Sequence, residues 1–362
     1  MATRLRLWVG ILCVLATIVL FWETRSNPGV FLVDKEECRA VGHEGVTFWK
    51  NASTHYPMGE IVEGPGLNRT DSRAACKFVE DNHSDHFPHT MQQLLRCFSY
   101  WNANPGDEKY FVAKHMPPNE FVKGFMLAMK EAYQLLQVRF RGDLKVVRPL
   151  VDYGFDYKPH LGYQVASAND IPGMRETIMN HYQLYGDTTA GCPKHQRAIE
   201  HPLPVIGILN RHRDHGRTLL NIDLLKEKLE QRFRTIVKVE YFEDKSFLGQ
   251  VVAMSEIDIL ISPHGAQLTG IPFMQPCGRV LELFPVGYHV PEFFGSLAVA
   301  SGLNYSYIYT GQNREVETKL WMKDLDSRTV ARLFPVCADT DIVLEAVKEH
   351  ILGWYKCCHI DP

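Results

Sequence analysis

The sequence has little net charge and few cysteines for its length. Its 39 Lys and Arg residues nearly balance 42 Asp and Glu residues, so the formal net charge is −3 over 362 residues. This balance excludes a protein that binds nucleic acid through bulk positive charge. Nine cysteines are too sparse for a small disulfide scaffold, and no paired CxxC motifs indicate a zinc site. The GxSxG, HExxH and GxxxxGK[ST] patterns are absent too, so hydrolase, zincin and P-loop functions have no support.

The composition is that of a globular protein with one long apolar run, at residues 7–22. This run carries no charge, follows Arg4 and Arg6, and ends at Glu23. It is slightly shorter than the roughly 20 residues of a typical membrane span, which suits a thin membrane such as that of the endoplasmic reticulum or Golgi. We expect a signal anchor with its N-terminus in the cytosol, and a cleaved signal peptide is the alternative. Both place the rest of the chain in the secretory lumen.

Glycosylation sequons and the cysteine count agree with a lumenal chain. Four sequons are present, three of them close together, with acceptors Asn51, Asn68, Asn82 and Asn304. Apart from Cys13 in the apolar run, the remaining eight cysteines are an even number. Several of them are expected to pair in an oxidising compartment, although the sequence does not show which.

Composition and periodicity divide the chain into five segments. These are a cytosolic tip and anchor helix (1–25), a stem or irregular segment (26–75), an N-terminal domain (76–195), a C-terminal domain (196–338) and a final helix that straps back to the first domain (339–362). Within the N-terminal domain, the pattern predicts helices at 90–100, 120–139 and 173–185, a short strand at 144–150 and a linker at 187–202.

The C-terminal domain alternates apolar strands with helices. Strands are predicted at 204–209, 235–241, 257–262 and 279–284, with helices at 219–233 and 246–254 and a helix start at 266–273. Continuous apolar strands alternating with helices indicate a parallel sheet covered on both faces, as in a Rossmann-like domain. Tyr305, Tyr307 and Tyr309 alternate along a further expected strand, where packing is favoured over ligand stacking.

A tight turn follows the strand at 257–262. Pro263, His264, Gly265 and Ala266 lead from the strand into the next helix. Such a turn directs backbone N–H groups and the positive end of the helix dipole beyond the carboxyl end of the sheet, which suits a phosphate. His264 is expected either to donate to a phosphate or leaving-group oxygen, or to cap its own loop.

This region resembles glycosyltransferase family 61. The residues that carry the resemblance are Ile257–Thr269, Val280–Pro285, and Ile208–Arg211 with Arg217 and Asn221. The similarity extends over roughly 203–290, and Gly270 departs from the Asn that the family usually has. The resemblance implies a GT-B-like α/β fold with two Rossmann-like domains and a cleft between them, and the apolar run at 7–22 is expected to place an N-terminal transmembrane helix before them. The resemblance also implies inversion at the anomeric carbon and no obligatory metal. In agreement, no DxD motif follows an apolar strand, and Asp339 reads as a helix N-cap.

Candidate residues for binding a nucleotide sugar lie in this C-terminal domain. They are Arg211, Arg217, Gly265, Ala266, Gln267, Thr269 and Glu282. Arginine forks match phosphate oxygens, and Arg213 in the same segment is a weaker candidate. Glu282 is expected either to accept hydrogen bonds from ribose hydroxyls or to form an ion pair within the fold. Asp258 is expected to be structural.

An inverting transfer also needs a base for the acceptor hydroxyl. His89 is the first candidate, because it precedes an amphipathic helix as in the family, although Gln92 and Gln93 stand where an acidic residue is often found. The alternatives are His86, Asp152, Asp156 and His160. With His264, His89 completes the expected catalytic pair.

The sequence therefore predicts a membrane-anchored glycosyltransferase with a lumenal catalytic domain in the Golgi or endoplasmic reticulum. Its expected partners are a UDP-sugar carrying GlcNAc or a pentose, a glycan or glycoprotein acceptor, and the membrane through residues 7–22, with no nucleic acid. The alternative is a catalytically inactive lumenal protein of the same fold that binds nucleotide sugars or glycans. Turnover of a nucleotide sugar separates the two.

Overall fold

The computed structural model describes about two thirds of the chain. The described residues are 48–51, 73–77, 87–103, 108–113, 120–133, 137–140, 162–163, 165, 167–184, 191–192, 203–311, 313–321 and 325–359. No helix among them has the length and hydropathy of a membrane span. The expected anchor (1–25), the expected strand at 144–150 and the sequons at Asn68 and Asn82 lie outside these residues.

The largest element is a six-stranded sheet with strand order β1-β9-β8-β7-β5-β6. Its strands are β1 (Phe48–Asn51), β5 (Ile206–Asn210), β6 (Val237–Tyr241), β7 (Ile259–Pro263), β8 (Arg279–Phe284) and β9 (Asn304–Tyr309). All pairs are parallel except β1 with β9. The predicted parallel sheet of the C-terminal domain is thus confirmed, including the strand of alternating tyrosines.

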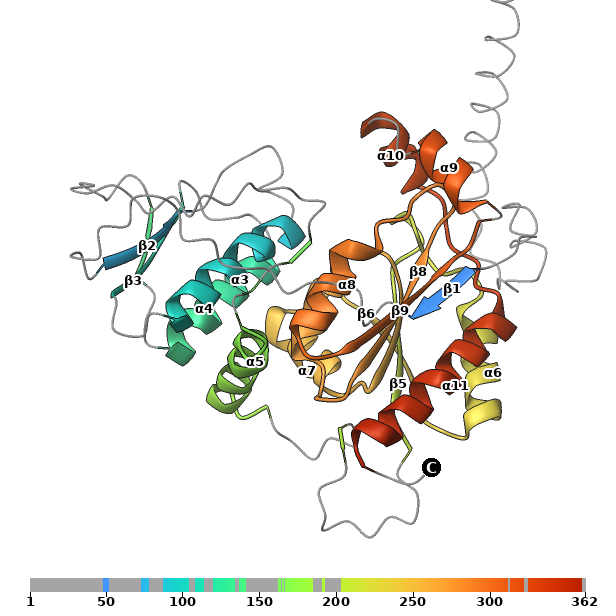
Figure 1. The fold of residues 1–362 in the computed structure, drawn as a ribbon, viewed down its shortest axis with the longest axis horizontal. Coiled ribbons are helices and arrows are strands. Elements are labelled where there is room, and N and C mark those ends of the chain that lie inside the picture. The colour runs from blue at the N-terminus through green and yellow to red at the C-terminus, as the bar shows by residue number, and fades with distance from the viewer. Residues whose placement is uncertain are drawn as a thin grey trace, which may run out of the picture.

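Helices cover both faces of this sheet (Figure 1). One face carries α6 (Ile222–Phe233) and α11 (Thr340–Cys357), and the other carries α7 (Phe247–Ser255), the 3₁₀ helix η4 (Ala266–Phe273) and α8 (Pro291–Ala300). Successive strand residues alternate between the two layers: Ile259 and Ile261 pack with α6 and α11, whereas Leu260 packs on the opposite side. Two short helices, α9 (Arg314–Trp321) and α10 (Leu325–Ala331), follow β9.

A second helical group extends the α7 side of the core. It consists of α3 (Phe87–Ala103), α4 (Glu120–Tyr133) and α5 (Asp170–His181). Phe247 of α7 stacks edge-on against Phe121 and Phe125 of α4, at centroid distances of 5.1 and 6.1 Å. At Gly124 a Cβ atom would lie 2.3 Å from the Cβ of Phe247, so the close approach of α4 to α7 requires glycine. The N-terminal helices and the large sheet therefore share one hydrophobic core.

A small parallel sheet of β2 (Arg73–Lys77), β3 (Glu108–Ala113) and β4 (Gln137–Phe140) accompanies these helices. Its third strand corrects the predicted helix at 120–139, which ends at Tyr133. Pairing of β4 with β3 is the physical reason, because tertiary pairing overrides a helical period that continues past the true end.

One further expectation needs correction. Residues 48–51 of the expected irregular stem form β1, because the edge of β9 offers unpaired backbone groups and Phe48 and Trp49 have high strand propensity. The final helix α11 packs on α6, β7 and β8 of the C-terminal domain, and the Cys192–Cys358 disulfide joins its end to the last part of the expected N-terminal domain. Its N-cap is Asp339, as predicted, and the carboxylate accepts from the backbone amides of Asp341 and Ile342.

Disulfides hold the end of α11. Cys192 pairs with Cys358, and Cys277 pairs with Cys357, which confirms the expectation that several cysteines pair. The sulfur atoms of Cys192, Cys277 and Cys358 lie within 4.8 Å of one another, but all three are disulfide-bonded and offer no thiolate to a metal. This is the only such grouping of potential ligands within the described ranges.

The two sequons in the described residues lie on strands of the large sheet. Asn51 ends β1 and Asn304 begins β9. In the second sequon the hydroxyl of Ser306 is fully buried and lies 2.6 Å from His350 Nε2. Glycosylation at Asn304 would therefore have to precede the folding of β9.

Candidate functional site

The turn after β7 is built around a glycine in contact with an arginine. The amide of His264 donates to the carbonyl of Leu283, which fixes the turn on β8. A Cβ at Gly265 would lie 2.6 Å from Nη1 of Arg211 and 2.3 Å from Oε1 of Gln267. The backbone of Gly265 is extended, so close approach rather than backbone angle requires glycine here. The expected helix after the turn is a 3₁₀ helix, η4.

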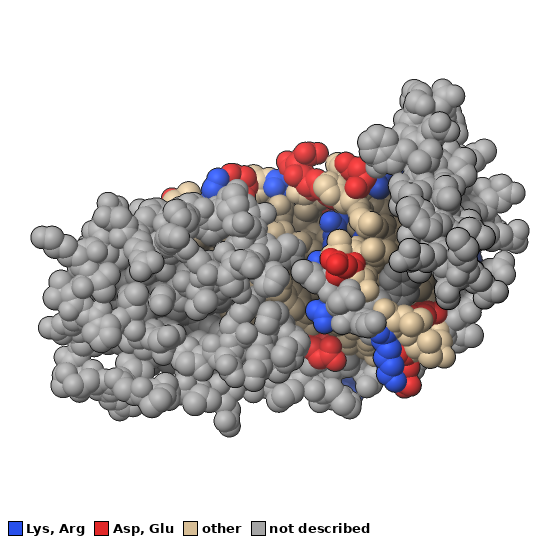
Figure 2. All heavy atoms as spheres, turned by 90° about the horizontal axis from the view of Figure 1, so that it is seen from above, with Lys and Arg blue, Asp and Glu red and all other residues tan. Residues whose placement is uncertain are grey.

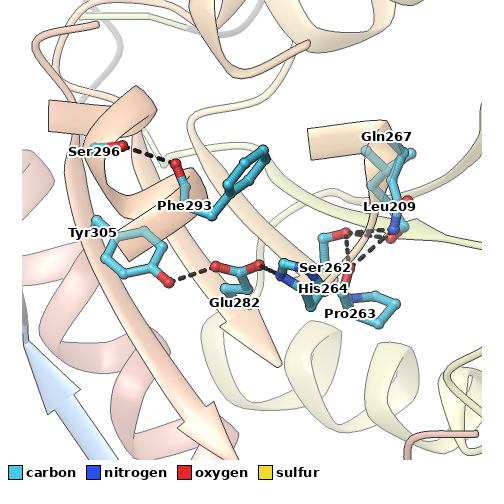
Figure 3. Close-up of polar contacts among 9 residues, drawn as sticks. All are labelled: Leu209, Ser262, Pro263, His264, Gln267, Glu282, Phe293, Ser296 and Tyr305. Atoms are coloured by element: carbon cyan, nitrogen blue, oxygen red, sulfur yellow. Dashed lines mark hydrogen bonds and ion pairs between the residues drawn. The ribbon is translucent and has the colours of Figure 1, made fainter. Parts of the chain in front are cut away.

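His264, Glu282 and Tyr305 form a buried polar chain (Figure 3). Nδ1 of His264 lies 2.6 Å from Oε1 of Glu282, and the hydroxyl of Tyr305 donates to the other carboxylate oxygen. His264 is 5% exposed and Glu282 is fully buried. Because both carboxylate oxygens are engaged inside the protein, Glu282 lies behind His264 instead of facing an open crevice. Of its two expected roles, the structure favours the contact within the fold.

Burial controls the protonation of this chain. Removal from water raises the pKa of Glu282 well above its usual value, while the Tyr305 hydrogen bond and the charge of Arg217 act in the opposite direction. The imidazole of His264 stacks on Phe284 at 5.1 Å and lies 5.0 Å from the ring of Tyr288. An ionised Glu282 accepts a hydrogen bond from Nδ1–H of His264 and thereby fixes the position of that proton and the direction of the ring.

Three arginines converge near the buried polar chain of His264, Glu282 and Tyr305. Arg211 follows β5, Arg217 ends the same loop, and Arg332 follows α10. Their buried nitrogens Nε and Nη1 of Arg211, Nε of Arg217 and Nε of Arg332 have no hydrogen-bond partner within the described part of the chain. Burial and the charges of Arg211 and Arg332 lower the pKa of Arg217 to about 9, while Tyr288 and Glu282 act in the opposite direction. A cationic cluster with unsatisfied donors is a site for an anion.

The backbone places two of these arginines. Arg217 has φ +70°, a left-handed conformation that is uncommon for a residue with a side chain, and its amide donates to the carbonyl of Phe334. At Gly216 a Cβ would lie 2.1 Å from the carbonyl oxygen of Arg332. The loop of Arg217 is therefore pressed against the segment of Arg332. Arg213, the weaker candidate, is exposed.

Arg332 is a candidate residue of the site that the sequence did not indicate. Its guanidinium lies over the ring of Tyr288, 5.3 Å from the centroid, in a cation–π contact. Arg332 is not part of a local sequence motif. It reaches the site only in the folded chain, through the position of α10. The convergence of distant segments was the missing signal.

The remaining sugar-nucleotide candidates lie on η4. The Gln267 amide donates to the carbonyl of Pro263 at 3.0 Å and to the hydroxyl of Ser262 at 3.3 Å, so it braces the turn (Figure 3). Thr269 is fully buried, and its hydroxyl has no partner among the described residues. Ala266 is partly exposed, which leaves its backbone accessible beside the arginines.

His89 lies near this site but does not contact His264. Its Nδ1 donates to Oε1 of Gln92 at 3.0 Å, and Gln92 in turn donates to the carbonyl of Gly162. The imidazole of His89 packs edge-on against Phe293 at 5.4 Å, and Phe294 contacts His264 at 5.3 Å. Two adjacent phenylalanines of α8 thus lie between the two histidines. The alternative bases His86, Asp152, Asp156 and His160 are outside the described residues.

Figure 2 shows one face of the molecule, on which described charged residues of both signs are visible between atoms drawn in grey. Lys and Arg side chains alternate there with Asp and Glu. A compact cluster of three arginines in a chain of nearly balanced charge favours a compact anionic ligand over a polyanion.

A parallel sheet with buried arginines and a glycine turn after its strands is an arrangement typical of α/β proteins that bind phosphorylated ligands. Residues 80–281 match the family model described as Glycosyltransferase 61, which is more than half of the chain. The chain belongs to glycosyltransferase family 61, and its class is that of a glycosyltransferase.

The chain is also similar to curated proteins named protein O-linked-mannose beta-1,4-N-acetylglucosaminyltransferase 2. The protein from Tetraodon nigroviridis is 32% identical over 31% of this chain and 20% of its own length. The Takifugu rubripes protein is 29% identical over 42% of this chain and 26% of its own length. The Homo sapiens protein is 31% identical over 30% of this chain and 19% of its own length. The chain thus spans about a fifth to a quarter of the length of these relatives.

Proposed function

We propose that the protein transfers GlcNAc or a pentose from a UDP-sugar to a hydroxyl group of a glycan or glycoprotein in the secretory pathway. The observation that carries this proposal is the convergence of Arg211, Arg217 and Arg332, whose buried nitrogens lack partners in the described chain. The names of the relatives favour GlcNAc as the sugar.

The proposed reaction inverts the anomeric carbon. The acceptor oxygen forms a bond to C1 of the sugar, the bond from C1 to the diphosphate oxygen breaks, and the diphosphate leaves with the electron pair. The acceptor proton passes to a base, for which His89 is our first choice. Negative charge on the diphosphate grows in the transition state, so the arginines stabilise that state more than the ground state. In this proposal they supply the charge that a metal provides in other glycosyltransferases.

His264 has the proposed role of donating a hydrogen bond from Nε2 to the departing diphosphate in its imidazolium form, because Nδ1 already donates to Glu282. Its ring is held by Glu282, by the stacked ring of Phe284 and by Phe294. A fixed donor directed at developing charge needs little reorganisation during the reaction. Gly265 permits the backbone to approach the same phosphate closely.

The proposal includes a GT-B-like arrangement and a membrane anchor. The sugar nucleotide would lie beyond the carboxyl ends of β5, β7 and β8, with the acceptor on the side of α3, where His89 lies. Residues 7–22 would anchor the chain in the Golgi or endoplasmic reticulum membrane, with the catalytic part in the lumen.

Paired arginine variants of the purified full-length chain test the proposal. In Arg217→Ala we expect UDP affinity to fall about tenfold or more and transfer to be lost, because a charge-assisted phosphate contact disappears. Arg213→Ala is the matched control, since Arg213 is exposed in the same loop, and it should retain both. Calorimetry with UDP and a transfer assay with UDP-GlcNAc and UDP-xylose give the readouts.

His264→Ala should lose transfer while the protein stays folded. UDP binding without any turnover of a sugar nucleotide would support the inactive alternative, and wild-type behaviour of both Arg217→Ala and His264→Ala would refute the site.

A further inference from the structure

A pocket lies at the end of the large sheet opposite to Arg211 and His264. Its volume is about 350 Å³, within the range of small-molecule sites. Arg279 and Asn304 are the first residues of β8 and β9 and pair in register, so the pocket lies at the amino ends of these strands. The site of Arg211 and His264 lies beyond the carboxyl ends. The lining residues are Arg279, Asn304, Glu349, His350, Leu352, Gly353 and Lys356.

The guanidinium of Arg279 is seated on the backbone of α11. A Cβ at Gly353 would lie 2.2 Å from both Cζ and Nη2 of Arg279. Only glycine allows this contact, although glycine inside a helix costs about 1 kcal/mol relative to alanine. The position of the guanidinium is therefore built into the packing of α11 on β8.

No salt bridge within the described residues compensates the charge of this guanidinium. Its Nε is buried and has no hydrogen-bond partner among the described residues. Burial is the only cause acting on the pKa of Arg279, and it lowers that pKa with no carboxylate to oppose it. A partly buried cation without a partner is unfavourable, and a bound anion removes that penalty.

The neighbouring histidine does not supply the missing charge. Burial and the charge of Arg279 lower the pKa of His350 to about 3, so the ring stays neutral. Its Nε2 lies 2.6 Å from the hydroxyl of Ser306, which fixes the ring beneath the pocket. Lys356 adds a second exposed positive charge, whereas Glu349 adds an exposed negative one.

Covalent and polar contacts hold the walls of the pocket in place. The Cys277–Cys357 disulfide joins the chain two residues before Arg279 to the residue after Lys356. Trp354 on the same helix donates from Nε1 to Asp258. Little ordering is needed when a ligand enters such a site, which favours binding of a small group.

From this geometry we propose that the pocket binds a small oxyanion — phosphate, sulfate or carboxylate — free or carried on a ligand no larger than a sugar phosphate. Arg279 binds the oxyanion, Lys356 adds attraction, and Leu352 supplies an apolar wall. The proposal is independent of sugar transfer at the other end of the sheet.

The test uses the full-length chain from an oxidising bacterial host that adds no N-linked glycan at Asn304. Inorganic phosphate, inorganic sulfate, glucuronate and glucose 1-phosphate are titrated by calorimetry in the presence of saturating UDP, with glucose as the neutral control. We expect Arg279→Met to weaken anion binding about tenfold. Lys356→Ala should weaken it roughly threefold, and Glu349→Gln should tighten it by a similar factor. Lys348→Ala, an exposed change on the same helix outside the pocket, should leave it unchanged.

Lys356→Ala and Glu349→Gln change exposed residues, so these two variants still decide the test if Arg279→Met fails to fold. Crystals soaked in tungstate should show an anomalous peak beside Arg279.

Equal affinity for phosphate and glucose 1-phosphate assigns a free ion to the pocket, and tighter binding of glucose 1-phosphate or glucuronate assigns a sugar-borne group. Anion binding that is insensitive to Lys356→Ala and Glu349→Gln, or a tungstate peak confined to Arg211 and Arg217, would overturn the proposal. Retention of UDP binding by Arg279→Met shows that the two sites are separate, whereas failure of UDP to bind at all counts against sugar transfer alone.

Discussion

At the scale of single residues, the site combines positive charge without partners and a carboxylate that is difficult to ionise. Arg217 and Glu282 influence each other across the turn: the charge of Arg217 lowers the pKa of Glu282, and Glu282 raises that of Arg217. A diphosphate entering beside Arg217 would neutralise this attraction, so sugar-nucleotide binding and protonation of Glu282 should be coupled.

Glu282→Gln should expose the positioning role of the carboxylate. We expect kcat to fall about tenfold to a hundredfold with little change in the KM for the sugar nucleotide, because the protonated His264 loses the negative charge that stabilises it. If transfer needs ionised Glu282, the wild-type pH–rate profile has an acidic limb caused by this ionisation. That limb should be absent from the profile of Glu282→Gln.

Tyr305→Phe is the matched control for Glu282→Gln. The Tyr305 hydrogen bond lowers the pKa of Glu282, so its removal raises that pKa and should move the acidic limb to higher pH. A profile that is the same in the wild type and in both variants would exclude ionisation of Glu282 from the mechanism. Circular dichroism should show both variants folded.

At the scale of elements, close approaches at glycines decide how the helices pack. Gly124→Ala places a methyl group 2.3 Å from the Cβ of Phe247, an atom held to the α7 backbone that cannot move away alone. We expect this change to lower the free energy of unfolding by about 1–3 kcal/mol through overpacking. Urea denaturation measures the difference.

The control for Gly124→Ala is a glycine with free space. Gly173 on α5 is exposed, and an added Cβ there meets no atom within 4 Å. Gly173→Ala should therefore be neutral or stabilise the protein by up to about 1 kcal/mol, because alanine has the higher helix propensity. Equal effects of the two substitutions would contradict the packing of α4 on α7 described here.

Elements formed by local patterns were predictable from the sequence. The strand at 279–284 has the predicted bounds, and the other strands of the C-terminal domain start or end within two residues of the prediction. Elements that depend on distant partners were not predictable. Four residues of β1 carry too short a pattern to be recognised without β9 beside them, and β4 continues a helical period until it pairs with β3. The same reason applies to the site, where motif residues Arg211, Arg217 and His264 were found but Arg332 was not.

At the scale of the whole molecule, distant segments meet at one buried carboxylate. Asp258 accepts hydrogen bonds from the amides of Gly191 and Val205 and from Nε1 of Trp354. It therefore joins the segment before β5, the start of the sheet and α11. The three contacts confirm the structural role expected for this residue.

Asp258 should make the stability of the protein depend on pH in a direction opposite to that of most carboxylates. Burial raises its pKa from 3.8 to about 6, and the three hydrogen bonds only partly oppose this rise. Because the folded pKa lies above the unfolded one, its contribution to stability is fully present below about pH 4 and declines as the pH rises through about 6. A rise of this size corresponds to about 3 kcal/mol at most.

The comparison of wild type with Asp258→Asn measures this contribution. Asparagine does not titrate, so the stability difference between the two proteins should shift in favour of Asp258→Asn as the pH rises from 4 to 7, whatever the constant penalty of the substitution. Denaturation at fixed pH values gives the slope. A difference that is constant across this range would show that Asp258 is already ionised at pH 4 in the folded chain, and its three hydrogen bonds would then outweigh its burial.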